Sequence, residues 1–181
     1  MGVNYQGVLH GFQTFIPHMV EHGEESHLMT TVSIAGLLPG SGTYGVSKHA
    51  VMALTEAARN DLLARGANVS VSARCPGFVD TNIDKSERNR PGYLTDPEVS
   101  LDESGISPVS KLLRRGKQPS EIADIVFEAI KEGIFYILPH PAWDDMLHDR
   151  FEQMLSREPL PTPSPDKMAR IFMPRDDGES Y

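Results

Sequence analysis

Tyr44 and Lys48 lie four residues apart in the stretch TYGVSKHAV, and Ser33 lies eleven residues before Tyr44. Residues four apart on a helix share a face, so the phenol and the ammonium group would point to one place. A phenol is a weak base at neutral pH, but a cation close to it stabilises the phenolate form. A serine hydroxyl delivered from the end of the preceding strand could hydrogen-bond the oxygen of a substrate. The three side chains therefore predict proton transfer to or from an alcohol or a carbonyl compound.

Two elements must position these groups, a buried strand that ends at Ser33 and a long helix that carries Tyr44 and Lys48. The hydrophobic pattern predicts strands at 27–33, 68–74 and 134–138, and helices at 3–22, 43–65, 119–132 and 141–156. Pro17 would kink the first helix or mark a bend near its end. Alternation of helices and strands predicts an α/β domain over residues 1–156, with helices on the faces of a parallel sheet of three strands.

The segment between the second strand and the third helix has a different composition. Residues 80–118 are polar and rich in Pro, Ser, Glu and Arg, without strong periodicity before VSKLLRR. A stretch of this length inside a compact domain is typical of a lid over a binding site. The tail at 157–181 contains several prolines and charges, so we expect it to be extended or disordered.

The overall charge limits the partners that we expect. The 181 residues carry a net charge of −8, from 17 basic and 25 acidic side chains. This balance disfavours a nucleic acid or an anionic membrane surface, which would require a basic patch. Cys75 is the one cysteine, so we expect no intrachain disulfide, a buried packing role for its thiol, and a reducing, cytoplasmic location.

Four segments occur in an order that resembles one known family. They are VNYQG with Asn4, Ser33-Ile-Ala-Gly, Tyr44-x-x-x-Lys48 and the CPGFVDT stretch at 75–81. This set is similar to the short-chain dehydrogenases/reductases over residues 1 to 156. The resemblance implies a partial Rossmann-like, doubly wound sheet. It also implies an NAD(P)-dependent oxidoreductase, which moves a hydride between nicotinamide and an alcohol or carbonyl substrate.

The resemblance also implies a role for each matched residue. Tyr44 would be the general acid/base, Ser33 would orient the substrate oxygen, and Lys48 would assist Tyr44 and bind the nicotinamide ribose. Asn4 would hold a water molecule in a proton relay to Lys48. The residues expected at the nicotinamide end of NAD or NADP are Tyr44, Lys48, Pro76, Gly77, Val79 and Thr81. Family members assemble as dimers or tetramers through two long helices, which would here be the helices at 3–22 and 43–65.

The sequence departs from the family pattern in two ways. The spacing between Ser33 and Tyr44 is shorter than the family's, which implies a shortened loop. The first half of the family pattern, with its TGxxxGxG phosphate loop, has no counterpart, so a preference for NAD or NADP is not readable. We therefore expect the chain to be a piece of a longer protein, which the coding sequence upstream of Met1 would test. The alternative is a non-catalytic truncated relative that acts through association of its helix pair.

Other motifs have competing interpretations. The glycines of the 36–42 stretch have GxxxGxG spacing, which suits either the phosphate loop of a nucleotide hydrolase or a plain strand-to-helix turn. His18 and His22 could bind zinc from one helix face, but solvent-facing histidines are favoured, and no metal site is predicted. Asn4 and Thr81 could instead be helix caps, and Arg88, Asn89 and Arg90 could contact an anion or lie in a solvated loop. We expect Trp143 to take part in packing, and we expect a solvated helix face at Asp144, Asp145, His148 and Asp149.

Overall fold

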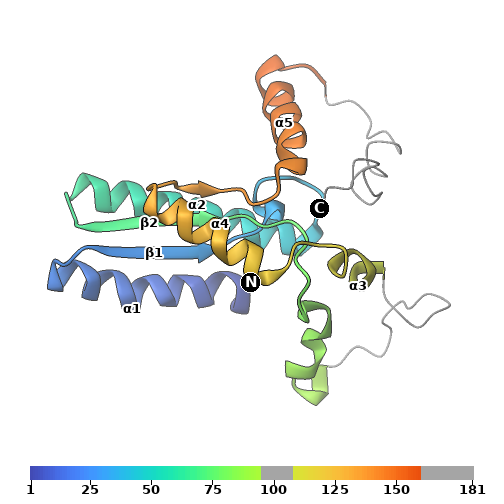
Figure 1. The fold of residues 1–181 in the computed structure, drawn as a ribbon, viewed down its shortest axis with the longest axis horizontal. Coiled ribbons are helices and arrows are strands. Elements are labelled where there is room, and N and C mark those ends of the chain that lie inside the picture. Colours follow the sequence, from blue (N-terminus) through green and yellow to red (C-terminus); the bar gives the residue numbers. More distant parts are fainter. Residues whose placement is uncertain (95–107, 160–181) are drawn as a thin grey trace. The chain divides into compact units, whose positions relative to one another are not determined.

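The computed structural model describes residues 1–94 and 108–159 of the chain. Within these ranges, three strands alternate with helices along the sequence (Figure 1). The strands are β1 (Ser26–Thr31), β2 (Val69–Arg74) and β3 (Tyr136–Ile137). The α-helices are α1 (Gly7–His22), α2 (Gly42–Ala64), α3 (Pro108–Leu113), α4 (Pro119–Lys131) and α5 (Asp144–Ser156). None of the described helices is long and apolar enough to cross a membrane.

The strands form one parallel sheet in the order β1-β2-β3. The register between β1 and β2 runs from Ser26 opposite Val69 to Thr31 opposite Arg74. The hydrogen bonding continues one residue beyond β1, because the Val32 amide donates to the Arg74 carbonyl at 2.8 Å. The prediction of an α/β fold with a parallel sheet of three strands is confirmed.

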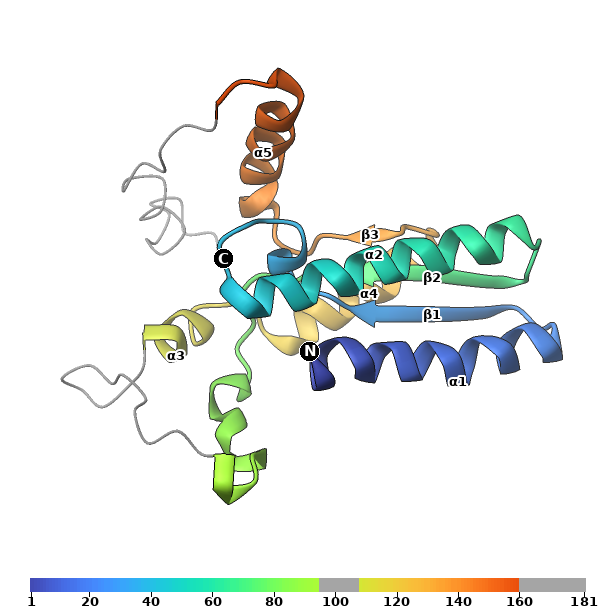
Figure 2. The same ribbon diagram turned by 180° about the vertical axis from the view of Figure 1, so that it is seen from behind.

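Helices lie on both faces of this sheet. Figures 1 and 2 show α1 and α2 on one face, and the part of α4 from Ala123 onward on the other. The alternating sequence of β2 explains this arrangement, because successive side chains of a strand point to opposite faces. Val69 and Val71 pack with Leu62 of α2 and with the apolar side of α1. Ser72 turns the other way, and its hydroxyl lies 2.8 Å from Nε2 of His27.

One cluster of the core lies between α2 and the carboxyl half of the sheet. Its buried members are Val32, Val51, Met52, Ala73 and Cys75. Two of them come from consecutive positions of α2, and the other three come from the ends of β1 and β2. The prediction that Cys75 is a buried residue is confirmed, because its side chain is only 1% exposed.

Several predicted boundaries need correction. The strand predicted at 134–138 is only Tyr136–Ile137, and the helix predicted at 141–156 is a 3₁₀ turn at Pro141–Trp143 followed by α5. The first helix begins as a π-helical turn at Gly2–Gln6, and α1 then continues through Pro17. Pro17 is exposed, so water can satisfy the carbonyl that its missing amide leaves without a partner.

The chain divides into two compact units, which we describe separately. One consists of Met1–Gly77 with Ala123–Glu158, and it contains the sheet. The other includes Phe78–Ile122. It carries 3₁₀ helices at Ile83–Asn89 and Gly92–Leu94 before α3, which the polar composition of the predicted lid did not indicate. Residues 95–107 of that lid, and the predicted tail from 160 onward, lie outside the described residues.

Burial of Leu62 gives a direct test of the core. Its side chain is 1% exposed, whereas its neighbour Leu63 is 59% exposed. We expect Leu62→Ala to lower the free energy of unfolding by about 2–5 kcal/mol, because it leaves a cavity between α2 and β2. The matched substitution Leu63→Ala should change it by less than about 0.5 kcal/mol. Denaturant unfolding of both variants makes the measurement, and equal effects would contradict this packing.

Candidate functional site

Tyr44 and Lys48 lie on one face of α2, as the spacing predicts. The Lys48 Nζ atom is 5.7 Å from the centre of the Tyr44 ring. It donates a hydrogen bond to the Thr31 carbonyl at 3.1 Å, which fixes the amine at the carboxyl end of β1. Tyr44 is 41% exposed. The phenol is therefore open to a ligand while the amine beside it is held by the sheet.

The Lys48 amine and the nearby Arg74 guanidinium belong to half-buried residues. Burial lowers the pKa of Lys48, and the nearby Arg74 guanidinium lowers it further. Burial also lowers the pKa of Arg74, whose Nη2 donates to Thr31 Oγ1 at 2.9 Å. Burial raises the pKa of the Cys75 thiol to about 12. The thiol is thus neutral at physiological pH and does not act as a counter-ion for the amine.

Ser33 lies two residues after the end of β1 and caps the 3₁₀ turn at Ile34–Gly36. Its Oγ atom accepts a hydrogen bond from the Ala35 amide at 3.2 Å. A hydroxyl that accepts in this way keeps its own O–H proton for donation to another group. The Ile34 amide donates to the Pro76 carbonyl at 2.9 Å, so the structure brings Ser33 next to the segment that follows β2.

Asn4 is connected to the helix that carries Tyr44. Its Nδ2 atom donates to Ser47 Oγ at 3.2 Å, and the Ser47 hydroxyl donates to the Tyr44 carbonyl at 2.7 Å. Asn4 lies inside the π-helical turn, whose cap is Met1, so the alternative that it serves as a helix cap is wrong. Ser47 was not identified from the sequence, although a serine between Tyr44 and Lys48 was a visible signal.

The glycine-rich stretch at 36–42 forms the turn between β1 and α2. A Cβ atom on Gly36 would lie 2.5 Å from Val32 Cγ1 and 2.8 Å from the Lys48 carbonyl oxygen. Gly36 is therefore required for close approach of this turn to α2. Packing accounts for it without a bound phosphate, which favours the plain strand-to-helix turn over a phosphate loop.

Pro76 and Gly77 lie beside a segment that the sequence analysis did not assign to the site. The Gly77 amide donates to Nδ1 of His140 at 3.1 Å. Trp143 is buried, as its predicted packing role requires, and its ring lies against Gly77. A histidine between two prolines, three residues after the end of β3, was the available signal for His140.

Val79 and Thr81 belong to the other unit, where two chain segments meet. Val79 pairs with Lys117 in a parallel bridge, and the Asp80 amide donates to the Lys117 carbonyl at 2.9 Å. The Arg114 guanidinium binds the Asp80 carboxylate, and it also donates to Asn82 Oδ1 at 3.3 Å. Arg114 thus contacts the residues on both sides of Thr81.

The histidine pair of α1 has a structural explanation. His18 and His22 are both exposed, and their rings lie 5.3 Å apart in an edge-to-face contact. His22 Nδ1 accepts a hydrogen bond from the Glu24 amide at 3.1 Å, where the chain leaves the helix. This role at the end of α1 favours the prediction of solvent-facing histidines over a zinc pair.

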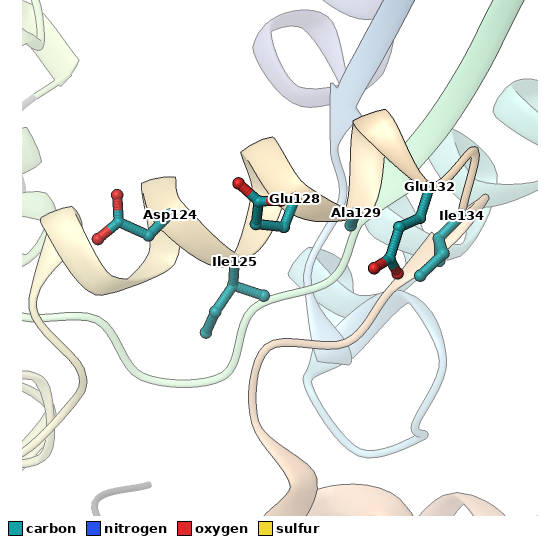
Figure 3. Close-up of a pocket in the computed structure, with 6 residues that line it drawn as sticks. All are labelled: Asp124, Ile125, Glu128, Ala129, Glu132 and Ile134. Atoms are coloured by element: carbon teal, nitrogen blue, oxygen red, sulfur yellow. The ribbon is translucent and has the colours of Figure 1, made fainter.

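A separate hollow lies on α4 and the loop after it, with a volume of about 480 Å³. Figure 3 shows the side chains that line it, which are Asp124, Ile125, Glu128, Ala129, Glu132 and Ile134. None of the residues predicted for the site is among them. The hollow therefore does not belong to the cluster around Tyr44 and Lys48.

Comparison with known proteins identifies the family. The family model described as short chain dehydrogenase matches residues 1–92, which include the segments with Asn4, Ser33, Tyr44, Lys48 and Thr81. The chain belongs to the short chain dehydrogenase family. This confirms the family that the motifs indicated, and two curated relatives of the chain are named as dehydrogenases.

Two curated relatives and one solved structure illustrate the similarity. The chain is 31% identical over 163 residues to the CLA biosynthesis dehydrogenase/reductase of Lactiplantibacillus plantarum, covering 86% of this chain and 57% of the relative. It is 30% identical over 158 residues to the C alpha-dehydrogenase of Sphingobium sp., with 86% and 51% covered. A short chain dehydrogenase/reductase from Burkholderia phymatum in complex with NAD is 41% identical, with a TM-score of 0.77, and 90% of this chain and 60% of that one are covered. The chain spans about half the length of the curated relatives it matches.

The contacts of Arg114 predict how the ends of the predicted lid are held together. The Arg114 and Asp80 side chains are 46% and 23% exposed. An ion pair of this exposure contributes about 1 kcal/mol, so Arg114→Gln should speed exchange of the Asp80 amide hydrogen roughly fivefold. Hydrogen exchange followed by NMR makes this measurement. Arg115→Gln, at an exposed neighbour, should leave the rate unchanged, and equal rates in the two variants would contradict the role of Arg114.

Proposed function

We propose that this chain carries the proton-handling part of an NAD- or NADP-dependent alcohol dehydrogenase or carbonyl reductase. The observation that carries the proposal is the arrangement around α2. Tyr44 is exposed beside the Lys48 amine, and Asn4 is linked through Ser47 to the Tyr44 carbonyl. The matched motifs and the dehydrogenase relatives support the same chemistry.

The residues fit one end of such a cofactor. Lys48 offers ammonium donors and Tyr44 a hydroxyl from one helix face, which suits the hydroxyls of a ribose. The Pro76–Gly77 peptide lies close to Ser33, and it provides backbone against which a flat ring can lie. Among the described residues, the turn at 36–42 is the one glycine-rich connection between a strand and a helix, and packing already accounts for Gly36. The proposal therefore concerns the nicotinamide and ribose end.

The proposed reaction has two parts, a hydride transfer that involves the cofactor and a proton transfer that involves residues of this chain. The nicotinamide of bound NAD or NADP supplies the hydride acceptor for an alcohol, or the donor for a carbonyl. Tyr44 removes the proton of the alcohol oxygen as the carbonyl forms, and it returns the proton in the reverse direction. The Lys48 cation stabilises the phenolate, and the Ser33 O–H donates to the substrate oxygen. Asn4 holds the start of a water relay that leads to Lys48.

Removal of the phenol oxygen tests the role of Tyr44. We expect Tyr44→Phe to reduce turnover of alcohol and carbonyl substrates by a factor of at least about 100, because the proton loses its acceptor. Binding of NADH or NADPH, measured by fluorescence titration, should persist. Tyr136→Phe is the control, because Tyr136 is also exposed and its hydroxyl donates to Glu56 Oε1 at 2.8 Å, away from Tyr44 and Lys48 in the sequence. Retained turnover in Tyr44→Phe would contradict the proposal.

A second candidate function is association through α1 and α2, for which the exposed apolar side chains give support. Phe15 and Val20 of α1, and Val46 and Leu63 of α2, are each between 39% and 63% exposed. Exposed apolar side chains on two helices favour burial against another protein surface. We propose a second copy of the chain as the partner, in a dimer or a tetramer.

Sedimentation equilibrium tests this association. We expect Phe15→Asp to weaken self-association at least about tenfold, because it places a charge in an apolar contact. Leu155→Asp is the control, since Leu155 of α5 is 79% exposed and lies on neither helix. A wild-type chain that associates but binds neither NADH nor NADPH would favour the non-catalytic function. A monomeric wild-type chain would contradict it.

A further inference from the structure

The peptide group between Pro76 and Gly77 is hydrogen-bonded at both ends. Its carbonyl accepts from the Ile34 amide at 2.9 Å, and its N–H donates to Nδ1 of His140 at 3.1 Å. Ile34 directly follows Ser33, so the first bond ties this peptide to the predicted substrate-orienting residue. Rotation of the peptide plane would break both bonds together and leave a half-buried N–H without its acceptor.

His140 is itself held firmly. It lies directly between Pro139 and Pro141, whose rings restrict the backbone on either side. The residue is 3% exposed, and its carbonyl accepts from the Trp143 amide at 3.1 Å to start the 3₁₀ turn. A ring nitrogen that accepts a hydrogen bond carries no proton, so the contact with Gly77 selects the neutral tautomer with its proton on Nε2.

The residues around Gly77 pack tightly against it. A Cβ atom on Gly77 would lie 2.6 Å from Trp143 Nε1 and 3.4 Å from the His140 ring. The Trp143 ring therefore occupies the space that any side chain at this position would need, and the His140 ring lies in van der Waals contact with that space. Residues 140–143 cover one side of the Pro76–Gly77 peptide, and Trp143 is 7% exposed.

We propose that His140 is a positioning residue for the nicotinamide end of the cofactor. Its Nδ1 atom fixes the plane of the Pro76–Gly77 peptide. His140 lies in the segment that follows β3, and it acts through this peptide rather than by contact with a reacting atom. The inference rests on the proposed function, because that function is what places Pro76 and Gly77 against the nicotinamide. A peptide held at both ends presents one fixed backbone surface to the ring, so less order has to be gained when the cofactor binds.

Two substitutions separate the acceptor from the volume of the ring. His140→Asn keeps an acceptor, since the amide oxygen of Asn occupies the same position along the side chain as Nδ1. His140→Leu removes the acceptor and keeps an apolar side chain. His148→Leu is the control, because the His148 side chain of α5 is 71% exposed. Fluorescence titration of the whole chain with NADH and with NADPH gives the dissociation constants, and NMR gives the exchange rate of the Gly77 amide.

We expect His140→Leu to weaken binding of the preferred nucleotide roughly tenfold, and to speed Gly77 exchange by a similar factor, because one half-buried hydrogen bond is lost. His140→Asn should stay within about threefold of the wild type, as should His148→Leu. Wild-type binding in His140→Leu, or equal loss in the Leu and Asn variants, would overturn the positioning role. A wild-type chain that binds neither nucleotide would instead contradict the proposed function. If the wild-type chain binds neither nucleotide, the exchange rate of the Gly77 amide still tests the hydrogen bond to His140. An unprotected Gly77 amide in the wild type would show that this bond is absent and would overturn the positioning role.

Discussion

The parallel pairing of β1 with β2 is the constraint on which the candidate site depends. Parallel strands end at the same edge of a sheet, so the residues that follow them meet there. The pairing continues through Val32 and Ile34 beyond β1, and it places Ser33 beside the Pro76–Gly77 peptide. A slip of one residue would turn the valines of β2 away from α1 and α2. The register that builds the core therefore also builds the site.

The second requirement is that α2 lies close against the end of β1. Gly36 allows this, because any larger residue there would collide with Val32 and with the Lys48 carbonyl. The close approach lets the Lys48 amine reach the Thr31 carbonyl. It also buries part of the amine, which is the main cause of the lowered pKa of Lys48, and it places the amine near the Arg74 guanidinium, which lowers this pKa further. The close packing of α2 against β1 therefore also produces the lowered pKa of Lys48.

Main-chain atoms hold most of the positioned side chains. Lys48 donates to the Thr31 carbonyl, Ser47 to the Tyr44 carbonyl, and the Gly77 amide to His140. A backbone carbonyl is present whatever residue occupies the position, and a backbone N–H is present in every residue except proline.

Local patterns determined much of this protein. The alternation in VSVSAR specified a strand with one apolar face, and the spacing of Tyr44 and Lys48 specified a shared helix face. The order of the motifs specified the family. The strand and the shared helix face follow from residues within a few positions of one another, where the repeat of a helix or a strand fixes which side chains share a face.

Other features were decided only by the tertiary structure. The Asn4–Ser47 contact joins residues 43 positions apart, and the Gly77–His140 contact joins residues 63 positions apart. β3 is shorter than its apolar sequence indicates, because its length depends on how much of β2 it pairs with. Such contacts depend on strand order, register and the approach of helices to the sheet, which no short stretch of sequence encodes. The sequence by itself thus determined the chemical groups and the elements that carry them, and the packing of those elements decided which groups meet.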